Sequence, residues 1–112
     1  MRPSLRLQKG STFEADVRLD VARDAGDMHG ALFEFLIGSG DAIVKVSTKR
    51  GGLRVNGATG AIDLSADQTA TLKPGTQPYE LRVTLRDGRT FALATGEADV
   101  VASRFRLGQS SR

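Results

Sequence analysis

The chain has 112 residues and contains no cysteine and no tryptophan; its aromatic residues are one tyrosine and five phenylalanines. The absence of cysteine excludes disulfide bonds and thiolate metal sites. No apolar run approaches the ~20 residues that a membrane-spanning helix needs. No apolar stretch follows the basic N-terminus, so no signal peptide is predicted. The 13 glycines and three prolines instead suit one ordered all-β domain with many turns.

Residues that carry out chemistry are also scarce. His29 is the only histidine, and the spacing of its neighbours Asp24 and Asp27 matches no calcium loop. Neither a Ser-His-Asp nor a Cys-His arrangement can be built from this set. Glu14 and Asp16 share one face of a strand, a pattern that is typical of a solvated surface. The sequence therefore predicts a protein that is not an enzyme and that has no catalytic, cofactor-binding or metal-binding residues.

Charge is distributed unevenly along the chain. Residues 1–10 have three basic residues and no acidic one, and residues 103–112 have the same balance. The other 10 basic residues share residues 11–102 with all 13 acidic ones, which gives that body a net charge of −3. Three charges without aromatic stacking partners are a weak basis for nucleic-acid binding. Two interpretations of the basic ends stay open: solvated ends, or arms that dock on acidic neighbours in an assembly.

Alternation of apolar and polar residues with a period of two is the dominant pattern. It is clearest over residues 13–19 and 79–85, each of which has one apolar face and one polar face. Residues 31–37 are almost wholly apolar and predict a central strand. Leu32 and Leu36 then lie on the face opposite the core. Either a loop covers them or they form part of a contact surface.

Turn signals separate the expected strands. Asn56-Gly57 predicts a two-residue hairpin, because both residues tolerate positive φ. Asp87-Gly88 joins residues 79–85 to a short strand over 91–93, and a last strand is expected over 97–102. Many short strands with a turn every ~8–12 residues are typical of a β-sandwich.

One helical turn interrupts this pattern over residues 65–71. Ser65 is its expected N-cap, because a hydroxyl can accept a hydrogen bond from the first free backbone N–H groups of a helix. Proline cannot continue a helix, so Pro74 limits its extent. We expect Ala70 and Leu72 to plug the open end of the sandwich.

The order of these pieces resembles the small immunoglobulin-like domain of many phage and prophage virion proteins, which is similar to the N-terminal domain of phage baseplate upper proteins. The resemblance runs from about Leu5 to Val101. The pieces that carry it are Gly-Ser-Thr-Phe (Gly10 to Phe13), Thr59 to Leu72, Pro74-Gly75, Tyr79 to Leu85 and Asp87-Gly88.

The resemblance implies an all-β fold, an immunoglobulin-like antiparallel β-sandwich of about 7–8 short strands with one helical turn near 65–71. The expected division is a sandwich over residues 1–102 and a basic C-terminal arm over residues 103–112. The implied function is that of a virion structural protein, either a baseplate or tail adaptor or a capsid-associated decoration or anchor.

Such a protein would contact other virion proteins (tail, baseplate or capsid) and copies of itself, but no membrane and no specific nucleic acid. We expect the protein in the host cytoplasm before assembly and in the virion afterwards. The alternative is a stand-alone carbohydrate- or ligand-binding β-sandwich module.

The predicted partner contacts lie on the two basic arms and on the outward face of residues 31–37. Phe105 and Leu107, flanked by arginines, can add a strand to a neighbouring sheet edge or fold back onto their own sheet. The predicted contact residues are Arg2, Leu5, Arg6, Leu32, Leu36, Arg104, Phe105, Arg106 and Leu107.

Overall fold

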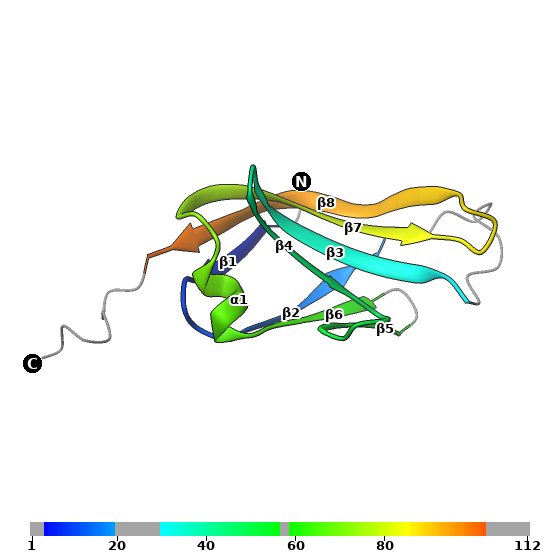
Figure 1. The fold of residues 1–112 in the computed structure, drawn as a ribbon, viewed down its shortest axis with the longest axis horizontal. Helices are drawn as coiled ribbons and strands as arrows, with labels where there is room; N and C mark the ends of the chain where they lie inside the picture. Colours follow the sequence, from blue (N-terminus) through cyan, green and yellow to red (C-terminus); the bar gives the residue numbers. More distant parts are fainter. Residues whose placement is uncertain (1–3, 20–29, 57–58, 103–112) are drawn as a thin grey trace, which may run out of the picture.

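The computed structural model describes residues 4–19, 30–56 and 59–102. These residues form eight strands and one short helix, shown in Figure 1. In chain order the elements are β1 (Ser4–Gln8), β2 (Phe13–Arg18), β3 (Leu32–Ser39), β4 (Ala42–Ser47), β5 (Leu53–Asn56), β6 (Thr59–Leu64), α1 (Ala66–Ala70), β7 (Gly75–Thr84) and β8 (Thr90–Val101).

The strands form two sheets that pack face to face. The larger sheet has the order β1-β8-β7-β3-β4, and the smaller one has the order β2-β6-β5. All pairs are antiparallel except β1 and β8, which run parallel. The fold is therefore an immunoglobulin-like β-sandwich, as the sequence predicts, with one parallel pair at the edge of the larger sheet.

The core fills the space between the two sheets. Phe35 and Leu81 enter it from the larger sheet and are fully buried, and Ile62 and Leu64 enter it from the smaller sheet. The ring of Tyr79 lies beside that of Phe35, with the ring centroids 5.7 Å apart. These inward residues alternate with exposed ones along each strand, which is why the period-two pattern identifies them.

Helix α1 closes the end of the sandwich where β8 terminates (Figure 1). Ser65 is its N-cap and forms a capping box with Gln68, as the sequence predicts for Ser65. Leu72 is fully buried, but the prediction for Ala70 is wrong, because Ala70 is exposed and Thr69 is buried in its place. Leu72 follows the helix in a tight turn, in which its backbone N–H donates to the carbonyl oxygen of Thr69 at 3.2 Å.

Thr69 attaches α1 to the turn between β1 and β2. Its Oγ1 accepts a hydrogen bond from the backbone N–H of Gly10 at 3.0 Å and donates one to the carbonyl oxygen of Ser11 at 2.7 Å. The Lys9 ammonium also donates to the carbonyl oxygen of Ala70. These bonds explain why a polar residue occupies a fully buried position.

The sequence predicts two separate strands at the C-terminal end of the sandwich, and the structure has one. Leu81 pairs with Ala94, and the next residue, Arg82, pairs with Ala92. Leu93 is therefore an extra residue, a β-bulge, and it is buried. The predicted break at Gly96 does not occur, because Thr95 and Gly96 stay paired with β7, and the bulge at Leu93 bends the strand without ending it.

Candidate functional site

Leu32 and Leu36 lie on the outer face of the larger sheet, and both are half-buried. The β-ladder explains this placement, because their neighbour Phe35 points into the core and alternate residues point the other way. Leu36 stands between Lys45 on β4 and Glu80 on β7. The outward position predicted for the two leucines is therefore present in the folded chain.

A groove of about 400 Å³ runs over this face and is called the outer groove below. Ile43, on the edge strand β4, is 51% exposed and is the one large apolar residue that is exposed in the described part of the chain. Ile43 is not among the contact residues predicted from sequence, although the alternation with the inward Val44 places it on the outer face of the strand. The outer groove is lined by Leu36, Gly38, Ile43, Pro78, Tyr79, Glu80, Arg82, Thr95 and Gly96.

Linked ion pairs fix the charged side chains beside the outer groove. The carboxylate of Glu34, whose side chain is 14% exposed, lies 3.4 Å from Nε of Arg82 and 3.6 Å from Nζ of Lys45. Arg82 also lies 3.9 Å from the carboxylate of Glu80. Two acids and two bases leave this rim without net charge. Each exposed pair contributes little to stability, so the effect of the set is mainly to hold the rim in one arrangement.

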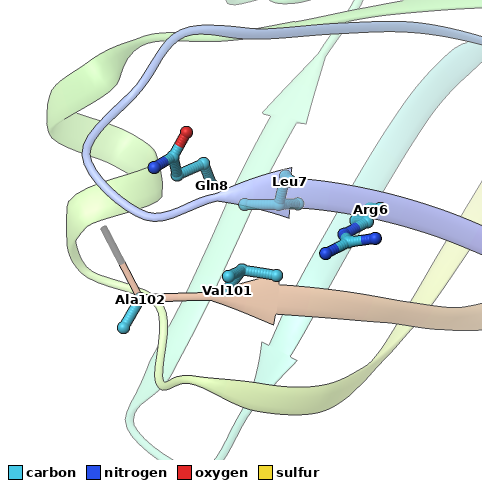
Figure 2. Close-up of a pocket in the computed structure, with 5 residues that line it drawn as sticks. All are labelled: Arg6, Leu7, Gln8, Val101 and Ala102. Atoms are coloured by element: carbon cyan, nitrogen blue, oxygen red, sulfur yellow. The ribbon is translucent and has the colours of Figure 1, made fainter. Parts of the chain in front are cut away.

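The β1 contacts predicted from sequence are of two kinds. Leu5 packs against the core, whereas Arg6 is exposed and stands beside Asp99 of β8. Arg6 lines a hollow of about 400 Å³. Figure 2 shows the residues around it near the ends of β1 and β8. Of the two contacts predicted on β1, Arg6 is thus the one whose side chain is exposed to a partner. The lining residues are Arg6, Leu7, Gln8, Val101 and Ala102.

Several predicted residues lie outside the part of the chain that the structure describes. The description begins at Ser4 and ends at Ala102. The residues that the sequence singled out and that lie outside this span or in its gaps at 20–29 and 57–58 are Arg2, Asp24, Asp27, His29, Gly57, Arg104, Phe105, Arg106 and Leu107.

The smaller sheet has a different surface chemistry. Glu14 and Asp16 of β2 are exposed, and Glu14 stands directly opposite the exposed Asp63 of β6. The sequence places the first two acids on one face but does not bring Asp63 beside them, because that requires the strand register. A hollow of about 510 Å³ lies next to Asp16, and its lining residues are Asp16, Arg54, Asn56, Thr59 and Ala61.

Two titratable groups among the described residues have a perturbed pKa. Burial in the core raises the pKa of Tyr79 above its usual value. The pKa of Asp87 is lowered, chiefly because its carboxylate accepts a hydrogen bond from the backbone N–H of Arg89, whose guanidinium is also 2.8 Å away. Tyr79 lines the outer groove together with Glu80 and Arg82, but its ring packs in the core. Asp87 lies in the turn between β7 and β8, so the two shifts follow from packing and from turn structure.

The described residues contain no group of three or more His, Cys, Asp or Glu side chains placed to hold a metal ion. Among the same residues, no helix has the length and apolar character to cross a membrane.

Comparison with known proteins adds little to this description. No protein-family model matches the chain, and no curated protein matches it. Among solved structures, murine CRIg is similar with a TM-score of 0.42 and 15% identity, over 90% of this chain and 92% of that chain. A likeness this weak supports no statement about function. The fold assignment rests on the two sheets and their strand order.

Proposed function

We propose that the protein is a structural component of a phage virion that acts through protein–protein contacts and catalyses no reaction. Its place would be a baseplate or tail adaptor, or a capsid-associated decoration or anchor. The proposal of a phage origin is supported by the order of sequence motifs, from Gly10 to Gly88. Other virion proteins and further copies of this chain would be its partners, and the host cytoplasm its location before assembly.

The outer groove is the observation that carries the proposal. Monomeric proteins normally leave large apolar side chains exposed singly, whereas apolar residues gathered in a groove with a polar rim are typical of interaction sites. Ile43 and Leu36 provide the apolar centre, and Glu34, Lys45 and Arg82 provide an ordered rim. Since all of them lie on paired strands, the surface is held ready for a partner.

The two basic ends supply the second kind of contact. Arg6 is exposed at one edge of the larger sheet, and residues 103–112 follow directly on β8. Modest contacts of this kind suffice in a symmetric particle, because many identical copies bind at once.

The first test is the composition of the particle. We expect mass spectrometry of virions purified from the phage that encodes the chain to detect it in a fixed ratio to the other structural proteins. Removal of residues 103–112 should leave a folded chain that no longer enters the particle, because the core described above is built from residues 4–102. Normal incorporation of the truncated chain, confirmed as folded by circular dichroism, would refute the role of the arm.

The volume of the outer groove favours a second candidate, a ligand-binding sandwich module, because small-molecule sites have volumes of ~300–1,000 Å³. A carbohydrate site usually presents an aromatic ring, and the ring of Tyr79 points into the core beside Phe35 instead. Glycan-array binding by the isolated chain, combined with its absence from particles, would favour this candidate over the structural role.

A further inference from the structure

The outer edge of β2 is open to another strand. β2 pairs with β6, and in the described part of the chain no other strand pairs with it. Its inward-facing Phe13 and Ala15 are only half-buried, although Val17 on the same face is 2% exposed. An edge strand presents backbone N–H and C=O groups that a further strand can bind. The β2 edge therefore offers both a backbone template and an apolar row that is not fully covered.

The outward face of the same edge is acidic. Glu14 and Asp16 are exposed, and Glu14 stands opposite Asp63. Like charges directly opposite each other destabilise a sheet. None of the ion pairs among the described residues includes any of these three acids. Arg18, two residues after Asp16, shares this outward face at the end of β2, whereas Arg54, in the cross-strand row of Asp16, is two strands away with Ala61 between them. Cationic side chains placed beside β2 would relieve this repulsion.

The C-terminal arm has the complementary pattern. Residues 104–107 read Arg-Phe-Arg-Leu, so a strand formed by them has two arginines on one face and two apolar residues on the other. The β2 edge alternates in the same way, with acids outward and apolar residues inward. The positive charge of residues 104–107 is therefore complementary to the acids of β2, and both segments alternate with a period of two.

We propose that the β2 edge receives residues 104–107 of a second copy of this chain as an added strand. Phe105 then lies opposite Ala15, whose small side chain leaves room for an aromatic ring, and the two arginines lie beside Glu14 and Asp16. This alignment is centred on Ala15, so it holds for a parallel or an antiparallel addition.

The inference rests on the proposed function, because it names one partner of the assembly role as a further copy of the chain. Every copy has both an arm and a β2 edge, so the contact is heterologous, head to tail. Repetition of such a contact closes into a ring or continues as a filament, depending on the rotation between copies.

A charge-swap experiment on the full chain tests the inference. One variant carries Glu14→Arg and Asp16→Arg, and the other carries Arg104→Glu and Arg106→Glu. We expect sedimentation velocity to show concentration-dependent association of the wild type. Each variant alone should need a roughly tenfold or higher concentration to associate, because two attractive pairs become repulsive. An equal mixture of the two variants should associate again, since each arm then finds an edge of opposite charge.

The matched control is Glu97→Arg combined with Asp99→Arg, which makes the same charge change on β8 of the larger sheet. It should leave association unchanged. Recovery in the mixture also shows that both variants are folded. Higher salt should weaken the association of the wild type, because exposed ion pairs are screened.

Disulfide cross-linking locates the contact. The chain has no native cysteine, so only the introduced cysteines can form the disulfide. A mixture of Ala15→Cys chains with Phe105→Cys chains should give a mixed disulfide dimer under mild oxidation, whereas Ile43→Cys in place of Ala15→Cys should not. A wild type that remains monomeric at all concentrations, or a mixture of swapped chains that does not associate, would overturn the inference.

The two proposals fail separately. Association that is insensitive to both swaps would show that copies assemble through another surface, which contradicts the β2 site and leaves the structural role in place. Absence of the chain from purified virions would contradict the structural role, whatever the swaps show.

Discussion

Tyr79 is the only tyrosine of a chain without tryptophan, so its ionisation can be followed without interference. Its ring is 3% exposed and packs beside Phe35 between the sheets. Burial disfavours the charged phenolate and raises the pKa. A raised pKa means that the unfolded chain ionises first as the pH rises. The contribution of Tyr79 to folding is therefore complete below its ordinary pKa of about 10 and is lost above it.

We expect an ultraviolet titration of the native chain to give a phenolate midpoint above that of the same chain in denaturant. The free energy of unfolding should fall as the pH rises beyond the denatured-state midpoint. Equal midpoints in the two states would show that Tyr79 is not buried as described.

Among the elements, the β3–β4 hairpin determines the shape of the outer groove, because Leu36, Gly38 and Ile43 of this hairpin line it. Gly38 pairs with Ile43 and has a φ of +117°, a conformation that side-chain-bearing residues rarely adopt. A Cβ added at Gly38 would lie 2.1 Å from the carbonyl oxygen of Ala42, so the hairpin would have to shift. The glycine thus determines where Ile43 stands on the outer face.

Comparison of Gly38→Ala with Gly51→Ala separates the cost of the positive φ from the cost of the steric clash. Gly51 also has positive φ, at +101°, but a Cβ there would meet nothing within 4 Å. Gly51→Ala should lose only the backbone term, of order 1–3 kcal/mol, whereas Gly38→Ala should lose clearly more because of the clash. Urea unfolding measures both values. Equal losses would show that the hairpin relaxes around the new methyl group.

The sequence predicts the strands well, because alternation follows directly from the pleat of a half-buried sheet. The capping box at Ser65 is likewise a local property. The predicted strand boundaries are wrong where the pairing between strands determines the boundary. The two-residue hairpin predicted at Asn56-Gly57 does join β5 to β6, but Asn56 pairs with Thr59, so the linking residues are 57–58, one residue later than predicted and outside the described residues. The bulge at Leu93 also depends on its partner strand, so no local pattern reveals it.

The candidate contact surfaces, like the strands, include some features that the sequence predicts and others that depend on strand pairing. Leu32 and Leu36 can be placed outside the core from sequence, because one strand face cannot hold every apolar residue of the 31–37 segment. The pairing of Glu14 with Asp63 cannot be predicted from sequence, because it depends on the register of β2 and β6. A shift of one residue in that register would move Asp63 to the other face.

At the scale of the whole molecule, the core supports two outer surfaces of different character. The larger sheet presents an apolar groove with a neutral, ion-paired rim, and the smaller sheet presents an acidic edge. A basic segment suits the second surface and not the first. One chain could therefore contact two kinds of neighbour at once, which the proposed structural role requires.

The central claim is that the outer groove is a site of protein contact, and Ile43→Asp tests it most directly. Burial of an isoleucine at a contact contributes about 1.5–3 kcal/mol, which the variant would lose. Asn56→Asp on β5 adds the same charge to an exposed position of the other sheet.

The measurement is the number of copies per purified particle, quantified by mass spectrometry. We expect at least about tenfold fewer copies for Ile43→Asp than for Asn56→Asp, with both variants as stable to urea as the wild type. Equal numbers of copies for the two variants would contradict the claim.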